Sequence, residues 1–271
     1  MAEKELNETE AVREKAMADL RAMMDEEEKK GEVKFHRRDD SFLLRYLRNK
    51  KFEVERAFAV VKKWAEFRRD HPEIYSNENY SMRALEAAYR TGYMQVLPDP
   101  DKFGRAVVLI DVKKVDFHKM DFEAYVACGM YMLEVMLEDA RRQVAGAVYI
   151  EDIGGLSFKN LMGLVRFMGK RKAMFQETMK DAIPIRIGGI YFMNQPWYLS
   201  FLLALIKPTL KKKMKDRFHV YGNSWDKLYE RLMPKEHLPP NFGGTKELHP
   251  DDFIEYAKKI EAGLKEKGIT L

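Results

Sequence analysis

The ten residues from 197 to 206, WYLSFLLALI, constrain the fold of this chain more than any other segment. Pro196 and Pro208 bound the segment, and Ser200 is its one polar side chain. A helix of this length rises about 15 Å, whereas the hydrocarbon core of a bilayer is about 30 Å thick. We therefore expect a helix that does not span a membrane and that contacts apolar material on several faces, either as a buried core helix or as a lid over a lipid cavity.

A dense cluster of positive charge follows this segment directly. Six Lys or Arg residues and one Asp lie between Lys207 and Arg217, so the cluster has a charge of +5, which equals the net charge of the whole chain. Cations beside an apolar helix are typical of proteins that bind anionic membrane surfaces, where each contributes about 1 kcal/mol. A solvated helix face is the alternative that this pattern leaves open.

Chain length, hydrophobic content and cysteine usage narrow the class of protein. With 271 residues, 46% of them hydrophobic, the chain has enough apolar material for one large domain or two small ones. The sequence has no signal-peptide core at its start and no apolar run of about eighteen residues, as a membrane-spanning helix needs. Cys128 is the only cysteine, which excludes an internal disulfide. We expect a cytoplasmic protein that associates with membranes peripherally.

Hydrophobic periodicity divides the chain into four regions. Residues 1–34 predict a charged N-terminal helix, and residues 35–91 predict a compact helical unit. Residues 92–249 alternate short β-rich runs with amphipathic helices, and residues 250–271 add a last helix. Such alternation is typical of a mostly parallel sheet with crossover helices. We therefore predict an α/β protein with a helical N-terminal module.

Motifs for catalysis, metal binding and nucleotide binding are missing from the sequence. The six His residues have no HExxH or paired ligand spacing, and neither GxSxG, a P-loop nor GxGxxG occurs after a predicted strand. Trp197 and Tyr198 lie within the apolar segment and do not interleave with the lysines, as nucleic-acid binding would require. We expect no catalytic residues, no metal, no cofactor and no nucleic-acid partner.

Three ordered motifs resemble one known family. Residues 39–68, DDSFLLRYLRNKKFEVERAFAVVKKWAEFR, resemble the helical N-terminal module of the CRAL-TRIO proteins. GGIYFMNQPWY at 188–198, with the Lys207–Pro208 pair, and LPPNFGGT at 238–245 resemble the lipid-binding module that follows it. The resemblance covers residues 35–255 and is closest to the retinaldehyde-binding and α-tocopherol-transfer branch. It implies a hydrophobic cavity that has the sheet as its floor and a gate helix at 194–207 as its cover.

The resemblance also implies which residues line the cavity. All of them are apolar or small, and at about 25 cal/mol per Å² of buried apolar surface such a wall can hold a lipid without a charged anchor. They are Val126, Gly129, Leu133, Ile150, Leu164, Phe175, Met179, Ile187, Ile190, Leu199, Leu203 and Ile206. Each of them alone is also what an ordinary core contains, so the set as a whole carries the prediction.

Glu151 interrupts this apolar pattern. It lies in the predicted strand AVYIEDI, where an unpaired carboxylate costs several kcal/mol or stays protonated. The matching stretch of the retinaldehyde binder also has an acid at this place, so the resemblance implies a polar anchor for a ligand head. The alternative is an outward Glu that bonds to a Tyr, a Lys or water.

Membrane contacts are expected at both the cations and the aromatic residues of the gate region. The resemblance places phosphoinositide contacts on Lys50, Arg186, Lys213 and Arg217, and the charged segment adds Lys211, Lys212 and Lys215. The apolar contacts are Trp197, Tyr198 and Phe201. Gly188 departs from the tocopherol-type pattern, which has a second basic residue there, and this leaves headgroup selectivity open.

We therefore expect a soluble, monomeric carrier of a hydrophobic small molecule. A retinoid, a tocopherol, a carotenoid or a similar isoprenoid lipid is the expected ligand, exchanged at anionic membranes that contain phosphoinositides. A lipid-sensing regulatory or scaffold protein that binds a phospholipid is the leading alternative, and a lipid-modifying enzyme is a more distant one. The sequence does not identify the lipid.

Overall fold

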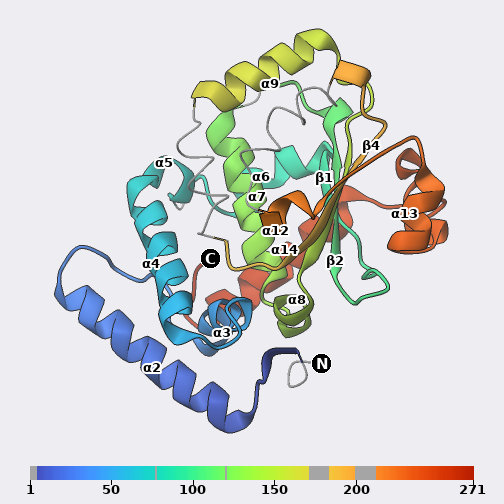
Figure 1. The fold of residues 1–271 in the computed structure, drawn as a ribbon. Coiled ribbons are helices and arrows are strands. Elements are labelled where there is room, and N and C mark those ends of the chain that lie inside the picture. The colour runs from blue at the N-terminus through green and yellow to red at the C-terminus, as the bar shows by residue number, and fades with distance from the viewer. Residues whose placement is uncertain (1–4, 77, 120, 171–182, 199–211) are drawn as a thin grey trace.

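Helices and a mostly parallel sheet lie side by side in this protein (Figure 1). The computed structural model describes residues 5–76, 78–119, 121–170, 183–198 and 212–271. In Figure 1 the N-terminal helices lie on one side of the sheet and the short helix α13 lies on the other. The predicted α/β class is confirmed.

The N-terminal helices form where the sequence supplies capping residues. Thr9, Asp39 and Ser81 each accept a backbone N–H at the start of a helix, which satisfies a donor that the helix itself leaves unpaired. The helices pack through one apolar stripe each, as in α2, which buries Leu20 and Met24. Their bounds are α2 (Glu10–Lys29), α3 (Asp40–Asn49), α4 (Val54–Asp70), α5 (Pro72–Tyr75) and α6 (Met82–Arg90).

Within the described part of the chain, five strands form one sheet in the order β1-β2-β3-β4-β5. β1 pairs with β2 antiparallel, and every later pair is parallel, as the alternation of strands and helices predicts. The strands are β1 (Met94–Val96), β2 (Ala106–Asp111), β3 (Ala147–Asp152), β4 (Ile187–Met193) and β5 (Phe218–Gly222). The remaining helices are α7 (Phe122–Met136), α8 (Ala140–Ala145), α9 (Phe158–Lys170), α12 (Lys212–Lys215), α13 (Trp225–Arg231) and α14 (Pro250–Lys265).

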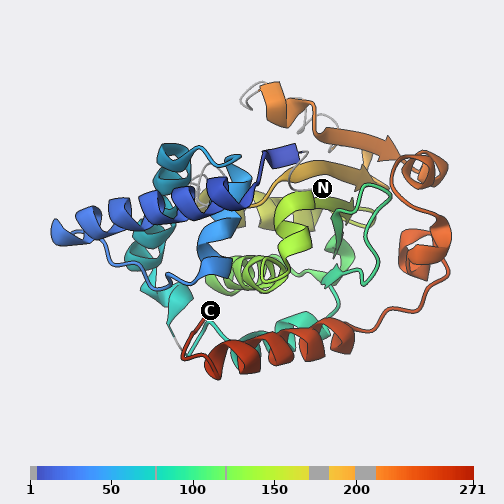
Figure 2. The same ribbon diagram turned by 90° about the horizontal axis from the view of Figure 1, so that it is seen from below.

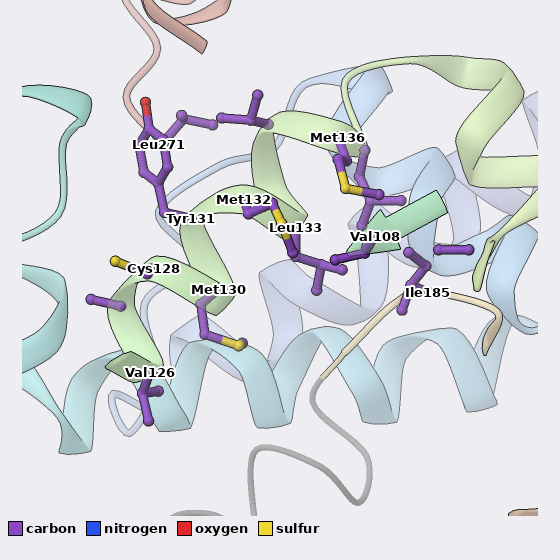
Figure 3. Packing of buried hydrophobic residues seen from close by; sticks show 14 of the residues in the cluster. Val108, Val126, Cys128, Met130, Tyr131, Met132, Leu133, Met136, Ile185 and Leu271 are labelled. Carbon is purple, nitrogen blue, oxygen red and sulfur yellow. The ribbon is translucent and has the colours of Figure 1, made fainter. Parts of the chain in front are cut away.

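The two faces of the sheet belong to separate hydrophobic clusters. One face, with Val108, packs in the large cluster that contains Leu133 and Met136 of α7 (Figure 3). The other face, with Val148, packs in a smaller cluster that contains Leu228 of α13. Because successive side chains of a strand point to opposite faces, β2, β3 and β4 each contribute to both clusters.

The helical module and the sheet are joined by buried polar contacts as well as by the large cluster. Arg37 and Arg45 both donate to Glu138, at 2.7 and 2.6 Å. Burial alone would raise the pKa of Glu138, but the two guanidinium groups outweigh it and hold that pKa below its usual value. The last helix, α14, runs along the lower edge of the view in Figure 2. Its Glu261 accepts a hydrogen bond from the Tyr131 hydroxyl of α7 at 2.6 Å.

Candidate functional site

The α7 face of the sheet bears an acid that has no partner among the described residues. Glu151 on β3 pairs in register with Ile110 on one side and Phe192 on the other. Its side chain is half-buried and makes no hydrogen bond or ion pair with another described residue. Burial raises the pKa of Glu151 to about 7, because the ionised form loses its hydration. At neutral pH this carboxyl is therefore more readily protonated than a solvated glutamic acid.

Two tyrosines accompany this acid. Burial, and then the charge of Glu151, raise the pKa of Tyr149 to about 12 and raise the pKa of Tyr125 on α7 still further. Tyr149 and Tyr125 are half-buried like Glu151. The sequence reasoning missed both tyrosines, although the strand alternation that places Tyr149 on the face of Glu151 is visible in the sequence.

Several of the predicted cavity residues belong to the large cluster on this side of the sheet. Val126 and Leu133 of α7 are buried in it (Figure 3). Ile190 of β4 is buried in the same cluster, and Ile187 packs against it. Gly129 lies on the same side of α7 as Val126 and Leu133, and a Cβ built on it would meet no atom of a described residue within 4 Å. The part of the chain that the structure describes therefore leaves the space beside Gly129 unfilled.

Ile150 was expected in the same wall, and this prediction is wrong. Its side chain is fully buried in the smaller cluster, on the α13 side of the sheet, together with Val148 and Leu228. The physical reason is the alternation of the strand, because neighbours such as Ile150 and Glu151 cannot point to one face. Other predicted positions lie outside the described residues or have undescribed side chains: Leu164, Phe175, Met179, Leu199, Phe201, Leu203, Ile206, Lys211 and Lys213.

An apolar surface lies at the carboxyl end of the parallel strands. Trp197, which follows β4, is 85% exposed. The Tyr198 hydroxyl donates to the Leu156 carbonyl, and the Tyr198 ring meets Phe158 edge to face at 6.2 Å. Tyr198 is thus placed against the start of α9, and the exposed Trp197 meets the Tyr198 ring.

Helix α9 itself exposes an apolar face that the sequence reasoning missed. Phe158, Met162 and Val165 are 66%, 50% and 48% exposed. Their spacing of four and then three residues places them on one side of the helix. This spacing is a signal that the sequence did contain, but burial is the usual interpretation of such a stripe.

Two predicted cations lie together at the opposite, amino end of the strands. Arg186 precedes β4 and donates to the Val144 carbonyl at 2.8 Å and to Glu5 at 3.1 Å. Arg217 precedes β5, and burial, followed by the charge of Arg186, lowers its pKa. Two guanidinium groups near each other favour an anion between or beside them.

The departure at Gly188 has a structural cause. A Cβ built on Gly188 would lie 2.3 Å from the Arg105 Nη1 atom, so the place of the missing basic side chain is taken by Arg105. Arg105 forms an ion pair with Asp101 at 2.6 Å. Of the remaining predicted cations, Lys50 lies half-buried at the end of α3, Lys212 is exposed and Lys215 is half-buried on α12.

Among the described residues, no helix is both long and apolar enough to cross a membrane, and no group of three or more His, Cys, Asp or Glu side chains is arranged to hold a metal ion.

The fold defines an α/β protein with a helical N-terminal module. The chain belongs to the CRAL-TRIO family of lipid-binding proteins: the CRAL/TRIO domain model matches residues 90–244, and the model of the CRAL/TRIO N-terminal domain matches residues 6–63. The family expected from the sequence is confirmed.

Individual relatives agree with this assignment. The chain is 33% identical to clavesin-1 of Rattus norvegicus over 229 residues, which is 84% of this chain and 63% of the relative. It is 32% identical to clavesin-2 of Homo sapiens over 84% of this chain and 68% of the relative. The chain thus spans less than two thirds of the length of the rat protein. The crystal structure of Sfh5 has the same fold, with a TM-score of 0.59 and 13% identity over 96% of this chain and 99% of that one.

Proposed function

We propose that this protein is a non-enzymatic carrier that holds a hydrophobic small molecule over the α7 face of the sheet and exchanges it at anionic membranes. An isoprenoid lipid with one polar head, such as a retinoid or a tocopherol, is the proposed cargo. Glu151 is the observation that carries this proposal, because it is a half-buried acid that has no hydrogen-bond or ion-pair partner among the described residues, on a mostly apolar face.

An unpaired carboxyl on this face is useful to a ligand that can hydrogen-bond it. With a pKa of about 7, the Glu151 carboxyl has a protonated form that donates to a carbonyl oxygen and an ionised form that accepts from a hydroxyl. A wholly apolar ligand would satisfy neither form and would leave the group desolvated, at a cost of about 1 to 3 kcal/mol. This supports a ligand with a polar head and an apolar body.

The open space beside Gly129 supports a position for that body. It lies on the side of α7 that carries Val126 and Leu133, which are buried in the large cluster and would have to repack against a ligand to contact it. Contact with these side chains would contribute about 25 cal/mol for each Å² removed from water. A ligand that extends from Glu151 toward α7 would therefore be held by apolar burial and oriented by one polar group.

Docking to membranes is proposed from charge and exposed apolar surface together. Arg186 and Arg217 offer guanidinium groups to phosphate, and the lysines from 211 to 215 add long-range attraction. Trp197 supplies apolar surface that can enter the interface between headgroups and acyl chains. Phosphoinositide-containing membranes are the proposed partner.

The test combines extraction of the bound lipid with two substitutions at one position. Native mass spectrometry of the purified protein is expected to show a lipid of one mass class that organic solvent removes. Glu151→Leu is expected to weaken a ligand with a hydroxyl or aldehyde head about tenfold and to spare a wholly apolar analogue, whereas Glu151→Gln retains part of the affinity. Ile150→Val, on the opposite face of the same strand, is the control and leaves the selectivity unchanged.

Two outcomes would contradict the proposal. Equal effects of Glu151→Leu on both ligand types would reduce Glu151 to a structural residue. Ligand binding without any transfer between vesicles would favour a lipid sensor that regulates a protein partner over a carrier.

A further inference from the structure

A basic pocket lies at the carboxyl ends of β2 and β3. Its volume is about 460 Å³. The loop after β2 and the first turn of α9 form its walls, and the lining residues are Lys113, Lys114, Val115, Asp116, His118, Lys119, Ser157, Lys159 and Asn160. In open α/β sheets this end of the strands is where ligands commonly bind. None of the residues in this pocket is among the membrane contacts expected from the sequence.

The pocket has an excess of positive charge. Four lysines line it against one aspartate. Lys113 is paired at 2.9 Å with Asp152, which is fully buried below the pocket, and Lys119 lies 3.8 Å from Asp116. Lys159 is exposed and makes no ion pair with another described residue. Asp111, whose carboxylate accepts from the backbone N–H of Lys113, is a third acid that acts on that lysine. With all three acids counted, four positive charges stand against three negative ones, so the pocket keeps a net positive charge that favours anions.

Contacts between the loop and α9 hold the walls in place. The Asn160 side-chain amide donates to the Val115 carbonyl at 3.1 Å. The His118 Nε2 atom lies 3.1 Å from the Lys159 carbonyl, and a Cβ built on Gly163 would be 2.9 Å from the same ring nitrogen. His118 therefore packs directly on the backbone of α9 where Gly163 leaves room. The cations are presented by a preformed wall and not by a loop that must first be ordered.

The same helix also carries the exposed apolar face of Phe158, Met162 and Val165. Lys159 is the neighbour of Phe158 in the sequence, so charge and apolar surface adjoin at the start of α9. A helix with an apolar face and flanking lysines lies in the plane of a membrane interface, with its apolar side below the headgroups and its cations among them. This arrangement distinguishes a lipid headgroup from a free phosphate compound, which needs no apolar neighbour.

We propose that this pocket binds the phosphorylated headgroup of a membrane lipid while the apolar face of α9 enters the interface. The pocket is a second phosphate-binding site, at the end of the sheet opposite to Arg186 and Arg217. The inference rests on the proposed function in one respect, that the protein works at anionic membranes. It does not depend on the identity of the cargo.

The experiment compares two double substitutions that remove the same charge. Lys119→Gln with Lys159→Gln changes the pocket and leaves Lys113 and its buried partner intact. Lys259→Gln with Lys267→Gln, at exposed positions of the C-terminal region, is the matched control. Binding is measured by cosedimentation with phosphatidylcholine vesicles that contain either phosphatidylinositol 4-phosphate or phosphatidylserine at equal total charge. Soluble inositol 1,4-bisphosphate is titrated by calorimetry in parallel.

The pocket variant is expected to lose about 30-fold in affinity for the phosphoinositide vesicles, since two cations near the surface are removed. The loss on phosphatidylserine vesicles is expected to be several-fold smaller, and the control variant is expected to bind like the wild type. Equal losses on both vesicle types, or equal losses in both variants, would overturn the proposal in favour of diffuse attraction. Soluble headgroup binding as tight as vesicle binding would overturn the choice of a lipid.

Ligand loading separates this inference from the proposed function. The pocket variant is expected to carry the same extracted lipid as the wild type. If the wild type carries no lipid and the pocket still selects phosphoinositide vesicles, the carrier proposal fails and the pocket stands. If the pocket variant binds vesicles normally while loaded with lipid, the pocket proposal fails and the carrier stands.

Discussion

The two ends of the parallel sheet offer different surfaces to an anionic membrane. At the amino end, Arg186 and Arg217 are half-buried, and Arg186 already donates to Val144 and Glu5. At the carboxyl end, Trp197 and Phe158 are exposed beside the lysines of the α9 pocket. The amino end has cations that are partly desolvated, whereas the carboxyl end has hydrated cations next to apolar surface.

This difference indicates how each end would contribute to docking. A guanidinium group that already donates hydrogen bonds within the protein must give them up to bind a phosphate. Such a group therefore contributes more to selectivity in the formed complex than to the initial attraction of the membrane. Exposed lysines beside apolar side chains attract a charged surface at long range and then allow insertion. We therefore expect the carboxyl end to contact the membrane first.

The largest effect is expected from the lysines that precede Arg217. Replacing Lys211, Lys212, Lys213 and Lys215 with Ala removes four of the positive charges that precede Arg217 in the sequence, so binding to anionic vesicles at low salt is expected to weaken by about 4 kcal/mol. Ligand affinity in solution is expected to stay the same. The measurement is cosedimentation across a salt series, because at about 0.15 M salt the Debye length is only about 8 Å. If vesicle binding changed neither with salt concentration nor with these substitutions, the lysines would not contribute to docking and would only form a solvated surface.

The second prediction concerns the acid near the carboxyl end of β3. Burial raises the pKa of Glu151 from 4.5 to about 7, so the folded state binds this proton more tightly than the unfolded chain does. The resulting stability is complete below pH 4.5 and is lost as the pH rises through 7. A difference of this size corresponds to about 3 kcal/mol in the free energy of unfolding.

Urea unfolding between pH 4.5 and 9 tests whether the free energy of unfolding falls as the pH rises. The wild type is expected to lose stability over that range, and Glu151→Gln is expected to remove most of this pH dependence. If the free energy of unfolding changed with pH in the same way for the wild type and Glu151→Gln, Glu151 would be solvated in the native state.

The apolar face of α9 is expected to contribute next. Replacing Phe158 and Met162 with Ser removes apolar surface at the carboxyl end and is expected to weaken vesicle binding by about 2 kcal/mol, with little dependence on salt. Phe103→Ser is the matched control, because Phe103 is also exposed but lies in the loop before β2, at the amino end. Equal losses for both variants would erase the distinction between the two ends.

The smallest effect is expected at Gly188. A methyl group there must displace the Arg105 guanidinium, which forms an ion pair with Asp101. Because the end of an arginine is flexible, Gly188→Ala is expected to lower the free energy of unfolding by about 1 kcal/mol and to leave vesicle binding unchanged. Thermal unfolding measures the first effect. A variant as stable as the wild type would show that Arg105 moves without loss.

The sequence by itself determined the order of helices and strands, the mostly parallel sheet and the family. These follow from local signals, because capping residues such as Asp39 and Ser81 and the periodicity of apolar residues act over a few positions. The acid at 151 also stood out within its strand, since a carboxyl among apolar neighbours is unusual wherever the strand packs.

Only the tertiary structure decided which of these residues share a surface. It placed Ile150 and Glu151 on opposite faces, filled the space at Gly188 with Arg105, and left Phe158 and Met162 exposed on α9. It also assembled lysines from two separate segments into one pocket. The physical reason is that the periodicity of apolar residues in the sequence shows which side chains of an element are to be buried. It does not show which residues they will contact, because those residues come from segments that are far away in the sequence.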